Sequence, residues 1–250
     1  MSEKKVIFIS GGAKNIGACI ARIFHDRDFD VIVHYHRSKK AAEHLVTDLN
    51  RLRSGSAEAL QADLTDAAQL ASLARQLPAL FGRLDVLVNN ASAFYPTPYG
   101  EVDSAQWDEL IDSNLRAAFF LTQNLRDELA CRQGVVINIV DTHADKPLAG
   151  HSVYSIAKAG LKAMTRALAQ ELAPQVRVNG VSPGAISWPP ALSDEQDPEV
   201  LRRREQILQQ VPLGHLGKPQ DIADAVFFLV NEASYMSGQV IRVDGGRHLS

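Results

Sequence analysis

The sequence has little of what marks membrane, secreted or nucleic-acid-binding proteins. Its 26 Lys and Arg residues against 29 Asp and Glu residues give a formal net charge of −3, so no basic excess favours a nucleic acid or an anionic membrane. No apolar run approaches the roughly 18 residues that span a bilayer, and the opening MSEKKVIFIS is too short in apolar residues for a secretory signal. We therefore expect a cytoplasmic protein with neither a nucleic-acid nor a membrane partner.

Cysteine is also scarce. Cys19 and Cys131 lie far apart and match no spacing that is typical of metal ligands or redox pairs. Two unpaired thiols fit a reducing compartment, and the sequence predicts no metal site.

Short β-rich runs alternate with segments of helical period. Strands are predicted at 5–10, 31–36, 58–63, 85–90, 135–140, 176–182 and 239–245, and helices at 39–52, 67–81, 105–129 and 152–172. Parallel neighbours need a crossover, and a helix is the usual one, so the pattern predicts an α/β fold with a doubly wound, parallel seven-stranded sheet of the Rossmann type. We expect residues 1–250 to form one domain.

One region is irregular and rich in Pro and Asp, from Pro183 to Val200. A loop of this length is often functional, and it is either a substrate lid, over about 184–210, or a long surface excursion.

A glycine-rich turn follows the first predicted strand in SGGAKNIG, residues 10–17. Gly11 suits a tight turn, Gly17 permits close packing of helix on sheet, and the amides at the helix start suit a pyrophosphate. Such a turn is by itself a weak signal, because many are only turns. After the third strand, Asp63 and Leu64 could contact an adenine. After the fourth strand, the small residues of NNAS, 90–92 among them, could contact a ribose.

The second strand ends in HYHRS, where a site for NAD would carry an Asp or Glu. His36, Arg37 and Ser38 stand there instead. A guanidinium pairs with a 2′-phosphate, so the predicted cofactor is NADPH. The alternative is a solvated basic turn.

Tyr154 and Lys158 are four residues apart and share one face of a predicted helix. An ammonium near a phenol stabilises the phenolate, so we expect Lys158 to lower the pKa of Tyr154 and Tyr154 to act as the proton donor. Lys158 could also hold a ribose. Asp141 precedes Tyr154 by thirteen residues, at the end of an apolar run.

These motifs resemble the short-chain dehydrogenase/reductase family over essentially the whole chain: SGGAKNIG, NNAS, Asn114 in DSNL, YSIAK, NGVSPGAI and VDGG. The resemblance implies a homotetramer and a catalytic group of Asp141, Tyr154, Lys158 and Asn114, in which Asn114 either holds a water or bridges helices. It also implies cofactor contacts from Gly11, Lys14, Asn15, Ile16, Gly17, Tyr35, His36, Arg37, Ser38, Asp63, Leu64, Asn90, Ala91, Ser92, Tyr154, Lys158, Pro183, Gly184 and Ile186.

Asp141 departs from the family, which usually carries a Ser at this spacing. An ionised Asp would repel the oxyanion that develops when a ketone is reduced. A C=N bond in an electron-poor ring needs a proton on nitrogen instead, and a carboxyl group in a closed site can supply or relay one through Tyr154. A pterin has such a bond and also has amino donors for an Asp.

The chain resembles the pteridine reductases in HYHRS, in NNASAFYPTP and in the VD that precedes YSIAK. That resemblance implies NADPH-dependent reduction of dihydropterins such as dihydromonapterin, dihydrobiopterin or dihydrofolate. It implies substrate contacts from Ser92, Phe94, Asp141, Tyr154 and Trp188, with Phe94 stacked on the pterin.

One departure and two alternative functions remain open. Asn15 stands where members often carry an Arg, which leaves the orientation of the substrate undetermined. A carbonyl reductase acting on oxoacyl carriers or sugars is the alternative enzyme, and a catalytically silent NADPH-binding regulatory protein is the alternative of another class. His143 and His151 flank the site, and we expect both to be peripheral.

Overall fold

Seven strands form where runs of Val, Ile and Leu predict them. In the computed structural model, which describes residues 4–188 and 192–250, the sheet consists of β1 (Val6–Ile9), β2 (Asp30–Tyr35), β3 (Ala57–Gln61), β4 (Val86–Asn89), β5 (Val135–Ile139), β6 (Arg177–Pro183) and β7 (Val240–Val243). All pair in parallel in the order β3-β2-β1-β4-β5-β6-β7. This confirms the predicted single-domain α/β fold of the Rossmann type.

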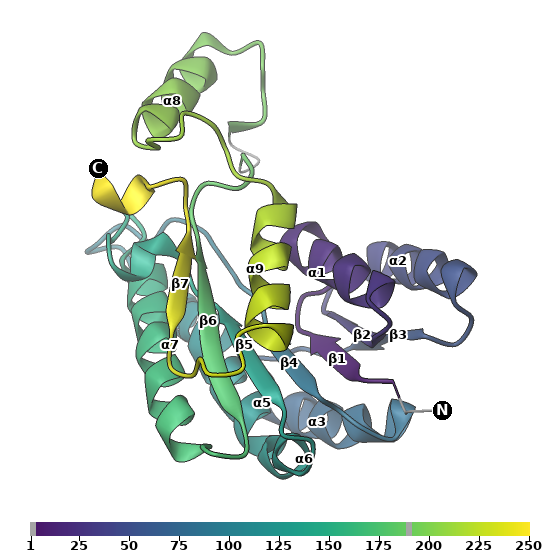
Figure 1. Ribbon diagram of the computed structural model, residues 1–250. Helices are drawn as coiled ribbons and strands as arrows, with labels where there is room; N and C mark the ends of the chain where they lie inside the picture. Colours follow the sequence, from purple (N-terminus) through teal and green to yellow (C-terminus); the bar gives the residue numbers. More distant parts are fainter. Residues whose placement is uncertain (1–3, 189–191) are drawn as a thin grey trace.

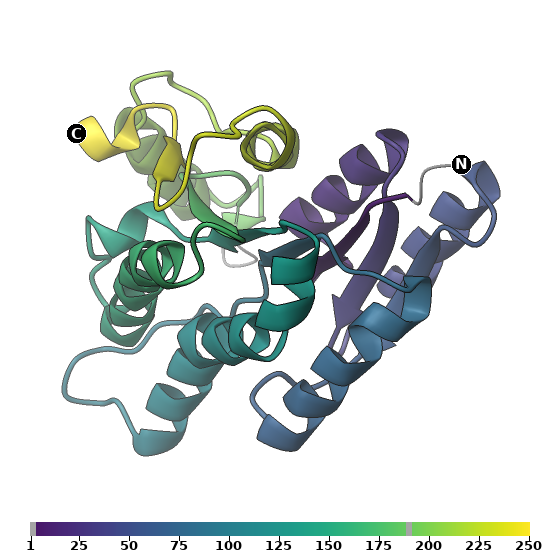
Figure 2. The same cartoon turned by 60° about the horizontal axis from the view of Figure 1, so that its bottom comes forward.

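Helices cover both faces of this sheet (Figures 1 and 2). The helices α1 (Asn15–Asp26), α2 (Lys39–Leu52) and α9 (Pro219–Asn231) pack on one face, and α3 (Ala67–Phe81), α5 (Ala117–Asn124), α6 (Arg126–Cys131) and α7 (Ser152–Glu171) pack on the other. Because successive side chains of a strand point to opposite faces, Ile7 and Ile9 of β1 join the first layer and Val6 and Phe8 the second. Burial on both faces explains the nearly continuous apolar runs.

The helix predictions hold where the periodicity is simple. The predicted helices 39–52 and 67–81 have those bounds, and the one predicted at 152–172 ends one residue earlier. The prediction of one helix at 105–129 is wrong. The segment divides into α4 (Ser104–Ile111), a π-helical turn η1 (Asp112–Arg116), α5 and α6.

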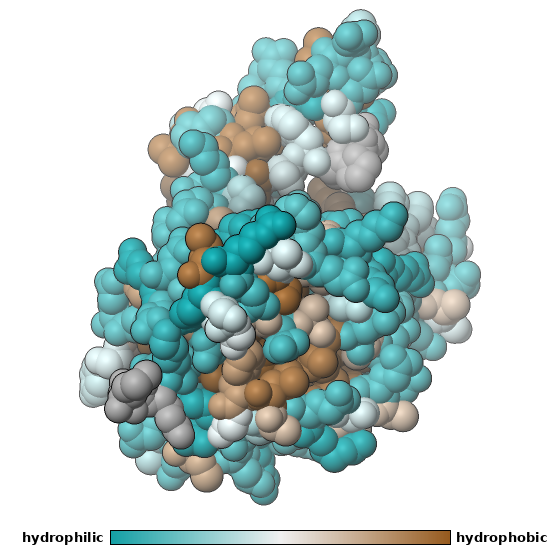
Figure 3. Space-filling view, turned by 90° about the vertical axis from the view of Figure 1, so that its right-hand side faces the viewer, coloured by the Kyte–Doolittle hydropathy of each residue, from teal (hydrophilic) through white to brown (hydrophobic). Residues whose placement is uncertain are grey.

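The segment after β6 rises away from the sheet. It leads to α8 (Pro198–Gln209), whose N-cap Asp197 accepts a hydrogen bond from the amide of Glu199, so the helix begins inside the predicted loop. Figure 1 shows α8 above the carboxyl ends of the strands, and Figure 3 shows this part as a mostly hydrophilic lobe above the body. Residues 189–191 of the predicted lid lie outside the described residues. No helix in the described ranges is long and apolar enough to cross a membrane.

Candidate active site

A cavity of about 630 Å³ opens at the carboxyl ends of the strands, where the strand order reverses between β1 and β4. Ligands of open α/β sheets bind at such a reversal. Fifteen of the predicted cofactor residues line it: Gly11, Lys14, Asn15, Ile16, Gly17, Tyr35, His36, Arg37, Ser38, Asp63, Leu64, Asn90, Ala91, Ser92 and Ile186. The other four, Tyr154, Lys158, Pro183 and Gly184, do not line it.

The turn after β1 has the close approaches that its glycines predict. Gly11 has a φ of 62°, and a Cβ there would lie 3.0 Å from the Cα of Ala91. A Cβ on Gly17 would lie 2.6 Å from the carbonyl oxygen of Gly11. The Ser10 hydroxyl accepts the amides of Asn90 and Ala91 at 2.8 and 2.9 Å, which joins this turn to the end of β4.

The cavity offers donors and cations for phosphate groups. The first turn of α1 carries no acidic residue, and its N-cap Lys14 makes no capping hydrogen bond from its side chain, so the first amides are available to an anion. Lys14 and Arg37 are exposed, and the side chain of neither has an ion pair or hydrogen bond within the described ranges. Asn15 stands where pteridine reductases often carry an Arg. It has a φ of 48°, which Asn tolerates better than most residues.

Asp141 and Tyr154 meet at the end of β5. The Tyr154 Oη donates a hydrogen bond to Asp141 Oδ2 at 2.7 Å, and Asp141 Oδ1 accepts the amide of His143 at 2.8 Å. Asp141 therefore also caps the short turn η2 (Thr142–Ala144). The side chain is half-buried against Tyr154 and does not turn outward into water.

The predicted lowering of the Tyr154 pKa is wrong, because other causes outweigh any effect of Lys158. Burial, with the adjacent Asp141 carboxylate and its hydrogen bond, raises the pKa of Tyr154 well above its ordinary value of 10, and a hydrogen bond from Ser92 opposes this only in part. The Lys158 Nζ lies 5.7 Å from the centre of the Tyr154 ring. Sequence spacing gave the proximity of the two residues, but it could not give the burial, which dominates the shift.

Lys158 is buried, with 2% of its surface exposed, and its Nζ donates one hydrogen bond, to the Ile139 carbonyl oxygen at 3.0 Å. Burial lowers its pKa from 10.5 to about 8, while the charge of Asp141 opposes the shift. An ammonium has three donors, so this group has capacity for further acceptors such as ribose hydroxyls.

Asn114 lies in the π-helical turn, a feature that is frequent at functional sites. Its Oδ1 accepts the Ser92 hydroxyl at 2.6 Å, and its Nδ2 donates to the carbonyl oxygens of Ala93 and Leu110 at 2.9 and 3.0 Å. These bonds make it a bridge between the loop after β4 and this turn.

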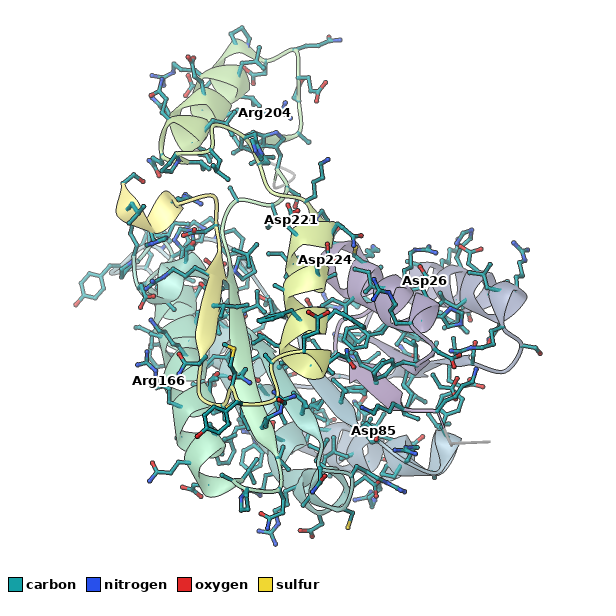
Figure 4. All side chains as sticks on the ribbon, in the orientation of Figure 1. Asp26, Asp85, Arg166, Arg204, Asp221 and Asp224 are labelled. Atoms are coloured by element: carbon teal, nitrogen blue, oxygen red, sulfur yellow. The ribbon has the colours of Figure 1, made fainter. Side chains whose placement is uncertain are left out.

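Phe94 is not core packing, since 47% of its surface is exposed. Its ring stacks on His151, with centroids 4.7 Å apart, and meets Tyr154 edge-on at 4.8 Å. His151, expected to be peripheral, therefore contacts a predicted substrate residue. Trp188 lies under the Arg204 guanidinium, 5.1 Å from the ring centre, and Figure 4 shows Arg204 directed from α8 towards the segment after β6.

Some lining residues escaped the sequence analysis, among them His34, Thr65, Glu109 and Ser113. Glu109 comes from α4, where no motif was found, and Ser113 precedes Asn114 in the motif DSNL, of which only Asn114 was given a role. His34 stands in a strand and would ordinarily be taken as core. No group of three or more His, Cys, Asp or Glu side chains that could hold a metal occurs in the ranges 4–188 and 192–250.

The fold and the site together define a Rossmann-type oxidoreductase. A family model described as "Enoyl-(Acyl carrier protein) reductase" matches residues 11–248. Pteridine reductase 1 of Leishmania tarentolae is 36% identical over 286 positions, which cover 98% of this chain and 96% of that protein. The 3-oxoacyl-[acyl-carrier-protein] reductase FabG of Staphylococcus aureus strain Mu50 is 34% identical over 254 positions, which cover both chains completely.

The family model and both relatives match nearly the whole chain, and both relatives are more than 30% identical to it. The protein belongs to the short-chain dehydrogenase/reductase family, whose reductases use NAD(P)H. The two relatives are about equally similar to it, so similarity alone does not choose between a pterin and an oxoacyl substrate.

Proposed function

We propose that the protein is an NADPH-dependent reductase that converts dihydropterins to their tetrahydro forms. Dihydromonapterin and dihydrobiopterin are the first candidate substrates, and dihydrofolate is a further one. The observation that carries the proposal is the hydrogen bond from Tyr154 Oη to the Asp141 carboxylate at 2.7 Å, at the position where the family usually presents a Ser hydroxyl. The similarity to a pteridine reductase supports it.

The cavity suits NADPH. The amides at the start of α1 would hold the pyrophosphate, and Arg37, with Ser38 beside it, would pair with the 2′-phosphate. The buried Lys158 ammonium would donate to the nicotinamide ribose. When bound, NADPH supplies the two electrons that reduce the C=N bond, with the new hydrogen placed on carbon.

Tyr154 would supply the proton that the ring nitrogen takes up. Its pKa lies above the ordinary value of 10, so Oη carries a proton at neutral pH, although the raised pKa makes it a weaker acid than an ordinary phenol. Asp141 holds this hydroxyl in place through Oδ2, and its other oxygen stays oriented by the amide of His143. A carboxylate here opposes an oxyanion, which disfavours ketones, and accepts amino donors, which favours a pterin.

The substrate would lie beside Phe94, whose exposed ring can stack on a flat heterocycle. Ser92, between Tyr154 and Asn114, would touch the ring or the cofactor. Trp188 and α8 would form the lid, within residues 184–210.

A steady-state panel tests the proposal. Purified protein is given NADPH with dihydromonapterin, 7,8-dihydrobiopterin, dihydrofolate, a 3-oxoacyl thioester or a sugar ketone, and NADPH consumption is followed. We expect turnover of at least one dihydropterin with a kcat/KM at least about tenfold above that of the thioester, a difference of about 1.4 kcal/mol. The reverse order would refute the pterin assignment.

The second candidate is a 3-oxoacyl-carrier reductase, which the 34% identity to FabG over the full length of both chains favours. The same panel distinguishes it. A third candidate, a catalytically silent NADPH-binding regulator, predicts NADPH binding with no consumption by any compound. We also propose a cytoplasmic homotetramer, with a mass of about four times 27.3 kDa by sedimentation.

A further inference from the structure

His34 connects three strand ends beneath the nucleotide cavity. It lies near the end of β2 with 2% of its surface exposed and lines the cavity from below. Its ring Nδ1 lies 3.0 Å from the amide nitrogen of Gly11, and its Nε2 lies 3.1 Å from the carbonyl oxygen of Ala62. Its own carbonyl oxygen accepts the amide of Gly12 at 2.9 Å. The turn after β1 is thereby joined to the end of β3.

These two partners decide where the ring carries its proton. A backbone amide can only donate, so Nδ1 must accept from Gly11 and is unprotonated. A carbonyl oxygen can only accept, so Nε2 carries the hydrogen and donates it to Ala62. The imidazole is therefore neutral, in a single tautomer, and both of its nitrogens are occupied.

The turn that His34 holds is sensitive to small movements. Gly11 has a left-handed φ of 62°. It lies so close to Ala91 that a Cβ on Gly11 would be 3.0 Å from the Ala91 Cα. The Gly11 carbonyl oxygen in turn accepts the Asn90 amide group at 3.1 Å. A shift of the Gly11 amide would alter the floor of the cavity between β1 and β4.

We propose that His34 is a positioning residue for the dinucleotide site, because it fixes the Gly11 amide and so the turn that leads to the phosphate-binding end of α1. The proposal rests on the NADPH assignment made above. His34 touches no reacting atom and acts through Gly11.

The surroundings favour the neutral ring. Burial lowers the pKa of His34 from 6.5 to about 4, with a smaller contribution from the neighbouring His36, while the bond to Ala62 and the charge of Asp63 oppose the shift. The ring of Phe8 of β1 also lies beside it, tilted, with its centroid 6.1 Å away. Protonation at Nδ1 would place a donor against the Gly11 amide and remove the bond.

Two isosteric variants separate the two ends of the ring. In His34→Asn, the side-chain oxygen can occupy the place of Nδ1 and accept from Gly11, but the bond to Ala62 is lost. In His34→Gln, the terminal amide can donate to Ala62, but Gly11 loses its acceptor. We expect the NADPH dissociation constant of His34→Asn to stay close to the wild-type value and that of His34→Gln to rise about tenfold or more. Circular dichroism and thermal unfolding, measured in parallel, verify that both variants fold.

A purely structural role would lower the melting temperature of both variants and leave their dissociation constants alike, which would overturn the inference. Wild-type protein that binds no NADPH would instead refute the proposed function and the inference with it. A second measurement is the ratio of the wild-type to the His34→Asn dissociation constant against pH, which cancels the titration of the ligand's own phosphate. We expect this ratio to rise as the pH falls towards about 4, and a flat ratio would contradict the role of Nδ1.

Discussion

In the proposed reaction, Asp141 would place a carboxylate beside the substrate atom that takes up the proton. Its Oδ2 accepts from Tyr154, and a Ser at that position could offer a hydroxyl donor to a substrate oxygen instead. We expect Asp141→Ser to lose dihydropterin turnover by about 10²-fold or more, the usual contribution of a group in the proton pathway, and to gain weak ketone reduction. The kcat/KM values for 7,8-dihydrobiopterin and a 3-oxoacyl thioester measure both effects. Unchanged pterin turnover would remove Asp141 from the mechanism.

Tyr154 is the proposed proton donor, and Tyr154→Phe removes only its hydroxyl. We expect kcat to fall by about 10²- to 10⁴-fold, because the proton source is lost, while the NADPH dissociation constant changes little. Stopped-flow single turnovers and fluorescence titration measure the two quantities. Substantial remaining activity would mean that another group supplies the proton.

Arg37 lines the cavity with an exposed side chain that has no partner within the described ranges, and we propose that it binds the 2′-phosphate. We expect Arg37→Ala to lower the ratio of kcat/KM for NADPH to that for NADH about tenfold, since a charge-assisted bond is lost. Lys40→Ala removes the same charge from a nearby exposed residue of α2 that does not line the cavity, and we expect it to leave the ratio unchanged. Equal effects of the two variants would show only general electrostatic attraction.

For individual residues, the sequence predicted which side chains meet but not how burial shifts their pKa values. The spacing of Asp141, Tyr154 and Lys158 predicted one cluster, and the structure brings them together. The direction of the Tyr154 shift was mispredicted because it depends on desolvation by the fold around it. His34 escaped notice for a similar reason, since only the folded chain places Gly11 and Ala62 at its two nitrogens.

Among the elements, the π-helical turn η1 and the α8 segment differ most from a regular helical pattern. Periodicity fixes the bounds of α2 and α3, because their apolar residues recur on one face. Periodicity cannot reveal η1, because a π-helical turn inserts one extra residue into the helix without any characteristic residue type that would mark it. The Asn114 side chain that donates to the Leu110 carbonyl lies within this turn.

The contact between Arg204 and Trp188 ties α8 to the segment after β6 (Figure 4). If this segment is the substrate lid, Arg204→Met should raise the KM for the pterin about fivefold or more and leave the NADPH dissociation constant unchanged. The largely buried guanidinium would lose both its cation–π contact and its hydrogen bond to the Leu192 carbonyl oxygen. Arg203→Met is the control, because Arg203 pairs with Glu199 on the same helix. Equal KM values for both variants would argue against a lid that depends on Trp188.

For the whole molecule, buried histidines make the free energy of unfolding depend on pH. His34 has a folded pKa of about 4 against 6.5 in the unfolded chain, so between these values the unfolded state binds more protons. Stability should therefore decrease as the pH falls from 6.5 towards 4, with His34 contributing about 3 kcal/mol to the loss. Burial also lowers the pKa of His25, which acts in the same direction.

Urea unfolding at pH 7 and pH 4.5 measures this dependence, and His34→Asn is the comparison because it cannot gain a proton. We expect the difference in unfolding free energy between the two pH values to be smaller in the variant. The same difference in both proteins would show that other groups cause the acid sensitivity.

Among residues 4–188 and 192–250, the Lys158 ammonium has one hydrogen-bond partner, the Ile139 carbonyl oxygen, and this has a consequence for stability. A buried ammonium with spare donors makes the unliganded chain less stable than it could be, and a ligand that brings oxygens to Nζ is thermodynamically linked to folding. In a cell, degradation of the transiently open chain would then be fastest when such a ligand is scarce. The amount of protein would thus follow the supply of its own ligand without any separate regulator.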